Sequence, residues 1–407
     1  MTAAPTPKNT LNRRAWLVLA GTALTGCGGG GLGDLVGAVA PGVGGTGAVY
    51  SQGTISGFGS VVVNAVKFDD SAATVLVNGH ATTPQDLRLG MVAEVNGERT
   101  GTDPMTGVAL GKARTIAVWS IAEGPISSLS FTCASPTSLQ VMGMRILIDG
   151  NTNLDATPLA VNQSVVVWGL VTDEAATQWR ATRVQVRPDT TMRMSTGRVR
   201  HMDGQVTLNG LALSGQAVAD LQEGQLVRVQ GTPTDAGALV VSQVWGLDAG
   251  LTAPTQTGLD FEIEGFVTST PVAGKFKVGN ISVDASAAAL AASLASLYLG
   301  ARLEVYGSWV DNTLVANKIE LKSQMSEDGS VVEIIGTVEI EGSIDSFTSA
   351  ADFVMRGQRC NAGQATFLHG TASDLPAAFL NQTRIKIDGR YEGAILMVDA
   401  LEFEEPD

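Results

Sequence analysis

The feature that most constrains this chain is a short pattern that recurs five times. Each copy reads leucine or phenylalanine, a turn residue three positions later, two apolar residues two positions apart, and glycine. The turn residue precedes the closing glycine by seven positions in every copy, whereas successive closing glycines are 62 to 82 residues apart. A constant motif with variable spacing indicates one module repeated with loops of different length. The copies are Leu87/Gly90/Ala93/Val95/Gly97, Leu159/Asn162/Val165/Val167/Gly169, Leu221/Gly224/Val227/Val229/Gly231, Leu297/Gly300/Leu303/Val305/Gly307 and Phe379/Gln382/Ile385/Ile387/Gly389.

The motif predicts a tight turn followed by a strand. Apolar residues two positions apart lie on one face of a strand. The turn glycine supplies a positive φ, and the closing glycine is expected to begin the next loop. Asn162 and Gln382 replace the turn glycine, so we expect units two and five to turn differently there.

The fourth unit gives the fullest order of elements. Residues 262–268, 275–278 and 281–283 are strand-like, 285–299 is rich in Ala and Leu without Gly or Pro, and 302–306 and 314–321 are again strand-like. A helix is therefore predicted over about 285–298. Three strands, a helix and two strands is the order of the oligonucleotide/oligosaccharide-binding (OB) barrel. The alternative is a sandwich of β-hairpins.

The fold class expected is mainly all-β: tandem small five-stranded OB-like barrels, with one longer helix in the fourth unit, in a rod. The proposed domains are a signal peptide at 1–26, a Gly-rich tether at 27–50 and barrel units at 51–120, 121–190, 195–248, 260–323 and 331–405.

The spacing and the L-x-x-G…V-x-V-x-G pattern resemble the bacterial repeat family called domain of unknown function 5666. The resemblance covers about residues 51–405. It implies an architecture often found in Gly-tethered lipoproteins of the cell envelope, and it implies no activity.

The first 27 residues have the features of an export signal. Arg13 and Arg14 precede a short apolar run at 15–23, which is too short to span a bilayer stably. Leu24-Thr25-Gly26-Cys27 resembles the lipobox of bacterial lipoproteins. The resemblance implies cleavage before Cys27 and lipid attachment to its thiol. It implies a location in the cell envelope, anchored in the outer membrane or facing the periplasm. The two arginines also fit a twin-arginine signal, so the export route stays open.

Composition and motifs favour a non-catalytic protein. The net charge of −14 disfavours nucleic-acid binding. His80, His201 and His369 lie in different units, so no metal site, no cofactor and no catalytic site is expected. Cys133 and Cys360 either form a bridge between units or are isolated small core residues.

Four aromatic residues form the candidate binding surface. Trp168 and Tyr306 immediately precede a closing glycine, in opposite phase to the core residues, and Trp179 and Trp309 fall in the expected loop between the last two strands. These rings either pack between units or bind a ligand. The favoured function is a lipid-anchored binding or scaffolding module with an unknown protein or glycan partner. The alternative is a glycan-binding lipoprotein that uses these aromatics.

Overall fold

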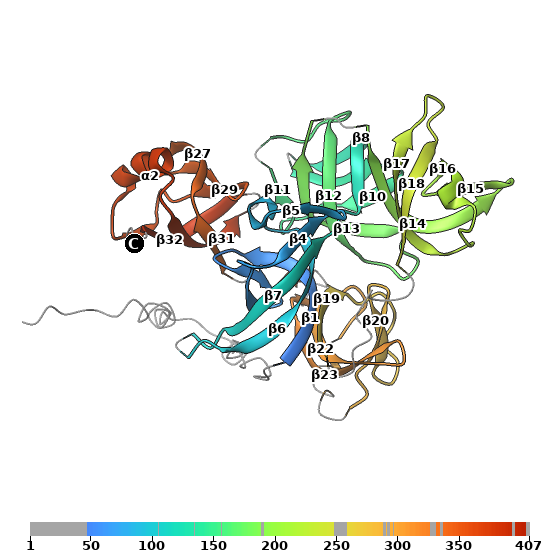
Figure 1. The fold of residues 1–407 in the computed structure, drawn as a ribbon, viewed down its shortest axis with the longest axis horizontal. Coiled ribbons are helices and arrows are strands. Elements are labelled where there is room, and N and C mark those ends of the chain that lie inside the picture. Colours follow the sequence, from blue (N-terminus) through green and yellow to red (C-terminus); the bar gives the residue numbers. More distant parts are fainter. Residues whose placement is uncertain are drawn as a thin grey trace, which may run out of the picture.

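A computed structural model describes residues 47–403, with gaps at 105, 134, 156, 189–190, 248–258, 288–289, 291–293, 296, 326–330, 334–336 and 393–394. The described chain forms five small β-barrel units, so the predicted all-β class with tandem barrels is confirmed (Figure 1). The signal segment, Cys27 and the tether up to residue 46 lie outside the described residues. No helix among the described residues is long and apolar enough to cross a membrane.

Units one and four share a 12-stranded sheet. Unit one contains β1 (Gly47–Gly57), β2 (Val61–Val63), β3 (Val66–Asp69), β4 (Thr74–Val77), β5 (His80–Thr82), the 3₁₀ helix η2 (Pro84–Asp86), β6 (Val92–Thr102) and β7 (Ala109–Val118). Unit four contains β19 (Asp260–Phe266), β20 (Lys275–Val278), β21 (Ile281–Asp284), β22 (Arg302–Val310) and β23 (Thr313–Leu321). The first strand begins at Gly47, inside the segment assigned above to the tether.

Units two and three share an 11-stranded sheet. Unit two contains β8 (Ala122–Thr132), β9 (Ser135–Val141), β10 (Met144–Leu147), β11 (Asn153–Leu154), β12 (Ser164–Val171) and β13 (Gln178–Val186). Unit three contains β14 (Arg193–Met202), β15 (Gln205–Leu208), β16 (Leu211–Ser214), the 3₁₀ helix η3 (Gln216–Val218), β17 (Leu226–Pro233) and β18 (Leu239–Gly246).

Unit five forms a sheet of its own, after the ribbon of β24 (Ser323–Met325) and β25 (Val331–Glu333). Its elements are β26 (Val338–Gly342), β27 (Ile344–Ser349), β28 (Asp352–Met355), β29 (Gln358–Asn361), β30 (Thr366–Leu368), the 3₁₀ helix η5 (Ala372–Asp374), α2 (Leu375–Asn381), β31 (Ile385–Glu392) and β32 (Ile395–Phe403).

All five units have the strand order of an OB-like barrel. Each unit has five core strands, numbered one to five along the chain; in unit four they are β19, β20, β21, β22 and β23, and in unit one β1, β2, β3, β6 and β7. In each unit the third core strand pairs in parallel with the last strand, as in β21 with β23. The first strand closes the barrel by pairing with the fourth, as in β1 with β6. The repeated motif therefore corresponds to the turn before the fourth strand and to that strand itself.

The closing glycine does not begin a loop, which corrects the expectation above. In every unit it lies within the fourth strand, at a shift of register against the last strand, such as between Tyr306 and Gly307. A Cβ on Gly307 would stand 2.1 Å from the carbonyl oxygen of Val315, and the other four closing glycines are similarly crowded. The glycine is thus required by a β-bulge in which two backbones approach closely.

The turn residue adopts a positive φ in all five units, as predicted. Its φ is 81° at Gly90 and 86° at Gly300, and it is 68° at Asn162 and 53° at Gln382. Units two and five therefore do not turn differently, because Asn162 and Gln382 accept the left-handed conformation.

Of the helix predicted over 285–298, residues 288–289, 291–293 and 296 lie outside the described residues. Residues 285–287 and 297–298 are not helical, so the predicted ends are wrong; residues 294–295 are helical, and the undescribed positions stay untested. A helix is described where none was expected, in unit five, where α2 ends at the left-handed Gln382.

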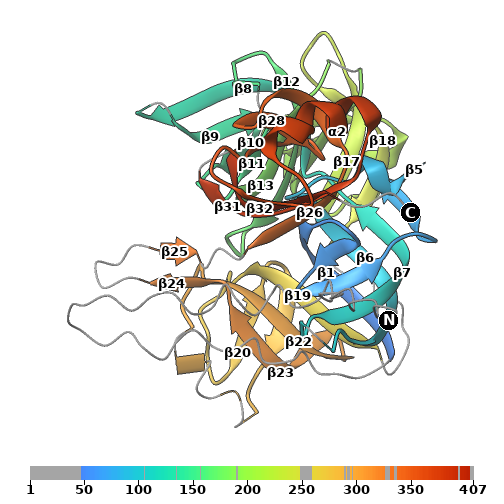
Figure 2. The ribbon, with the colours of Figure 1, turned by 90° about the vertical axis from the view of Figure 1, so that its left-hand side faces the viewer.

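The units form a cluster and not a rod. In Figure 1 unit one lies between unit five on one side and units three and four on the other, with unit two above it; in Figure 2 unit one lies at the right, between the barrels of units two and three above and that of unit four below. Strand β1 pairs in parallel with β19, although about 200 residues separate them in the chain. One apolar cluster combines the cores of units one and five with Trp168 and two neighbours from the outer face of β12, and units two, three and four each have a separate core.

Candidate functional site

A pocket of about 130 Å³ lies where units one to four meet. Strands β6, β12 and β17, each the fourth strand of its unit, contribute residues to it, and β19 of unit four completes the wall. The side chains that line it are mainly apolar, with a few polar groups among them. The polar and aromatic side chains of the lining are Gln52, Glu94, Trp119, Trp179, Arg228, Glu264 and Asn280.

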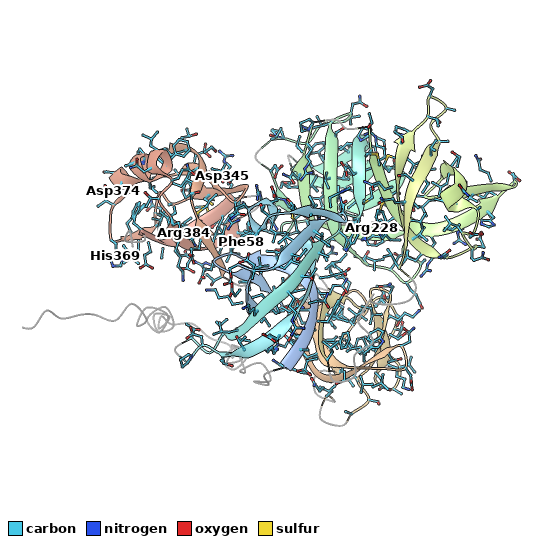
Figure 3. All side chains as sticks on the ribbon, viewed as in Figure 1. Phe58, Arg228, Asp345, His369, Asp374 and Arg384 are labelled. Atoms are coloured by element: carbon cyan, nitrogen blue, oxygen red, sulfur yellow. The ribbon has the colours of Figure 1, made fainter. Side chains whose placement is uncertain are left out.

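Arg228 is the cation of the pocket (Figure 3). It is 9% exposed, and its Nε has no hydrogen-bond partner. Its guanidinium lies 5.1 Å from the ring centroid of Trp119, and that ring packs edge-on against Trp245 at 5.3 Å. Burial lowers the pKa of Arg228 to about 10, against the opposing charge of Glu94, so the group is still charged at neutral pH.

The two carboxyl groups of the pocket have different surroundings. Glu264 accepts hydrogen bonds from the backbone N–H of Thr54 at 2.6 Å and forms an ion pair with Arg302 at 2.6 Å. Burial alone would raise its pKa, but Arg302 and Thr54 hold the pKa below its ordinary value. Burial raises the pKa of Glu94, although Arg228 acts in the opposite direction.

Glu94 is not engaged in the same way. Among the described residues it makes no ion pair within 4 Å. Its polar neighbour is the buried Tyr50 phenol: burial, then the charge of Glu94 and a hydrogen bond to it, raise the pKa of Tyr50, and the same hydrogen bond acts to lower the pKa of Glu94. The amide oxygen of Gln52 is buried without a hydrogen-bond partner, and the buried Tyr50 hydroxyl, although close to Glu94, has no partner in good hydrogen-bond geometry. Unmet polar groups therefore surround this pocket.

Of the four predicted aromatics, only Trp179 lines the pocket. Trp179 and Trp309 lie on β13 and β22 and not in a loop, because the last two strands continue beyond the bulge. Trp179 is 7% exposed and donates from Nε1 to the carbonyl of Ala176. Trp309 is half-buried against Phe261, at a centroid distance of 5.6 Å.

Trp168 and Tyr306 are too buried to form part of an exposed binding surface. Both point away from their own barrel cores, as their strand phase predicted, but Trp168 is 0% exposed and Tyr306 6%. Trp168 belongs to the apolar cluster of unit one, so a neighbouring unit covers it. The Tyr306 hydroxyl is bound to the carboxylates of Glu304 and Glu320, at 2.7 and 3.2 Å.

Sequence reasoning missed Arg228, Glu94 and Gln52. Gln230, two residues from Arg228 on β17, immediately precedes a closing glycine, where a polar residue favours a solvated face, yet it is buried. One pattern in the sequence could have indicated this site. Trp119 and Trp245 do not follow the alternation of the core residues on the last strands of their units, so their side chains are expected outside the barrel cores. Nothing in the sequence indicated that the outer faces of three separate barrels meet.

The cysteines and histidines lie in separate places. Cys133 and Cys360 are both free; Cys360 is buried, but Cys133 is exposed in a turn, so it is not a core residue. His201 lies 3.0 Å from the carbonyl of Leu221, and His369 lies 3.3 Å from Glu402. Within the part of the chain that the structure describes, no three His, Cys, Asp or Glu side chains are grouped to hold a metal.

A comparison with known protein families matched two of the barrels. Residues 123–185 and 264–320 match the family model of domain of unknown function DUF5666. These two segments carry the DUF5666 domain. They span most of units two and four, and units one, three and five lie outside the matched residues. Neither the curated proteins nor the solved structures gave a match to the chain.

Proposed function

We propose that this chain is a lipid-anchored protein of the cell envelope that binds a small molecule, without catalysis, in the pocket where barrel units one to four meet. The observation that carries the binding proposal is Arg228. A buried guanidinium with an unpartnered Nε is costly unless a further group satisfies it. A pocket that is mainly apolar with a few convergent polar groups is the usual form of a small-molecule site.

The composition of the pocket favours binding over catalysis. Among the described residues that line it there is no Ser, Thr, Cys or Lys nucleophile and no His base. Glu264 is already engaged by Arg302 and Thr54. The glycan-binding alternative has less support, because Trp168 and Tyr306 are buried between other groups.

A ligand screen tests the binding proposal. Trp119 and Trp179 line the pocket, so an occupant is expected to change the tryptophan fluorescence of the purified full chain. It is also expected to stabilise the fold, by about 2.7 kcal/mol at a concentration of 100 times Kd. The library should hold neutral, anionic, cationic and zwitterionic compounds of metabolite size. If no compound changes either signal, the binding proposal is wrong.

The anchoring proposal rests on Leu24-Thr25-Gly26-Cys27 and the basic and apolar segments before it. A Cys27→Ser chain lacks the thiol to which the lipid would be attached. It is therefore expected to lose labelling by a fatty-acid probe and to leave the membrane fraction, since stable membrane attachment depends on the acyl chains. Cys133→Ser is the matched control and should behave as the wild type, since Cys133 lies in a turn of unit two. Continued acylation of the Cys27→Ser chain would contradict the lipobox interpretation.

A further inference from the structure

We propose that the occupant of the pocket is a small zwitterion that places a carboxylate on Arg228 and an amino group on Glu94. This inference rests on the proposed binding function and specifies the ligand of the same site. Its basis is the arrangement of unmet donors and acceptors around one pocket, together with the size of that pocket.

Arg228 forms the pole that receives the carboxylate. Its guanidinium is held against the face of Trp119, which is itself held by Trp245, so its orientation is fixed before a ligand arrives. Arginine binds carboxylates through two parallel hydrogen bonds, a geometry that its planar donors provide. Its Nε is buried without a hydrogen-bond partner, so the hydrogen-bonding capacity of this guanidinium is not met by the described residues.

Glu94 forms the pole that receives the amino group. The neighbouring carboxylate Glu264 is engaged by Arg302 and Thr54, whereas Glu94 makes no ion pair within 4 Å among the described residues and has the Tyr50 phenol as its one hydrogen-bonding neighbour. The amide oxygen of Gln52, which also lines the pocket, is a second acceptor, and it has no donor. An ammonium group has three donors and no acceptor, which suits this set.

A ligand of a single charge would fit this pocket poorly. A simple anion on Arg228 would leave a negative charge near Glu94, and a simple cation on Glu94 would leave Arg228 unmatched. In a site of low dielectric such an unbalanced charge is strongly disfavoured. A molecule with both charges removes both imbalances at once.

The volume of the pocket limits the size of the ligand. A protein cavity of about 150 Å³ holds benzene, which indicates roughly six non-hydrogen atoms for the 130 Å³ found here. Alanine has that number of non-hydrogen atoms, and a sugar ring with its hydroxyls is about twice as large. The walls include Ile121, Leu226 and Ile263, against which a small apolar side chain can pack.

The first test compares alanine with three compounds that are no larger than alanine and that each lack one of its two charges. Alanine, propionate, ethylamine and alaninamide are titrated into the full chain, with calorimetry and tryptophan fluorescence as readouts. We expect alanine to bind at least tenfold more tightly than each of the other three. If propionate, ethylamine and alaninamide bind as tightly as alanine, the proposal of a zwitterionic ligand is wrong, whereas the proposal that the pocket binds a small molecule is supported. If no compound of the wider screen binds, the proposed function fails as well.

The second test uses two variants whose effects differ in kind. Arg228→Gln is expected to weaken alanine binding at least tenfold. Glu94→Gln is expected to remove the preference for alanine over propionate, because Arg228 is then the one charged side chain of the described lining besides Glu264, which is paired with Arg302. If Glu94→Gln leaves that preference unchanged, the assigned amino pole is wrong, even if Arg228→Gln fails to fold.

Each variant has a control in which an exposed residue of the same type is changed, on the same strand or on the neighbouring one. Arg200→Gln changes an exposed arginine of unit three that is paired with Glu223, and Glu98→Gln changes an exposed glutamate on β6 that is paired with Arg114. Both controls should bind alanine as the wild type does. An equal loss in a control and in its partner variant would show a general charge effect and overturn the assignment.

Discussion

The outer faces of the fourth strands of units two and four build two very different junctions with unit one. Trp168 and Tyr306 occupy the same position of the repeated motif, immediately before the closing glycine. Trp168 is fully buried in an apolar cluster that includes the core of unit one. Tyr306 lies among charged groups, bound to Glu304 and Glu320 and with Lys318 4.8 Å from the centre of its ring.

The surroundings of these two residues extend the contrast. Across the sheet from Trp168, the buried Arg183 donates to the carbonyl of Leu89 in unit one at 3.1 Å. Near Tyr306, the ion pair between Arg99 of unit one and Glu262 of unit four is almost completely buried. Burial lowers the pKa of Arg99, and the Tyr306 phenol is one of the groups that oppose this.

The repeated motif therefore determines that the side chain before the closing glycine points out of its own barrel. The type of that residue determines whether the junction with unit one is apolar or charged. Burial of apolar area is favourable at about 25 cal/mol per Å². The attraction within a buried ion pair is largely offset by desolvation of its members. We therefore expect the junction of units one and two to contribute most of the stability between units. The charged junction of units one and four should instead specify how β1 and β19 align.

Replacing Trp168 by alanine should give the largest effect. The change removes a fully buried ring, so we expect a loss of about 3–5 kcal/mol in the free energy of unfolding. Urea denaturation followed by circular dichroism measures it. Trp168→Phe should cost less, because the indole N–H has no hydrogen-bond partner to lose. Trp309→Ala, at a half-buried ring, is the control, and an equal loss there would contradict the special role of the Trp168 junction.

At the charged junction, the single and double changes should differ in a characteristic way. Glu262→Leu leaves Arg99 buried without its counter-ion and should cost about 3 kcal/mol. Arg99→Met combined with Glu262→Leu should recover most of that loss, because apolar residues of similar volume often replace a buried pair at little cost. The same denaturation measurement gives both values. A double variant as unstable as the sum of two singles would mean that this junction stabilises as strongly as the apolar one.

The sequence predicted the barrel units because their information is local. The turn before the fourth strand and the alternating core residues, such as Val227 and Val229, are set by neighbours within a few positions. The closing glycine was misinterpreted for a physical reason. Its requirement is the close carbonyl of another strand, 2.2 Å from a Cβ at Gly231, and sequence spacing does not reveal that contact.

The arrangement of the units could not be predicted, because its determinants are distant in the chain. The parallel pair of β1 and β19 and the contact of Arg99 with Glu262 join segments more than 160 residues apart. The outer position of Trp168 was predictable from strand phase, but its partner was not. Arg228 could not be distinguished from an ordinary surface arginine, because it is buried only by other units.

The smallest expected effect, and the one that most sharpens the contrast between junctions, is that of Tyr306→Phe. The ring is kept and only the hydroxyl is lost, so the loss should be about 1 kcal/mol at neutral pH. Its dependence on pH is the informative part. Burial raises the pKa of Glu304, and the hydrogen bond from Tyr306 counteracts this by favouring the ionised form. Without the phenol the pKa of Glu304 should rise further.

The sign of that dependence follows from linkage. A carboxyl group whose pKa is higher in the folded state weakens the fold as pH rises above its ordinary value, and has no such effect below it, where both states are protonated. The loss caused by Tyr306→Phe should therefore be greatest near pH 7 and shrink toward pH 4. Tyr298→Phe is the control, since the Tyr298 hydroxyl pairs with the neutral Ser323 at 2.9 Å and its loss should vary little with pH. The same flat profile for Tyr306→Phe would mean that its hydroxyl does not stabilise a charged carboxylate, and that the two junctions differ less than their residues indicate.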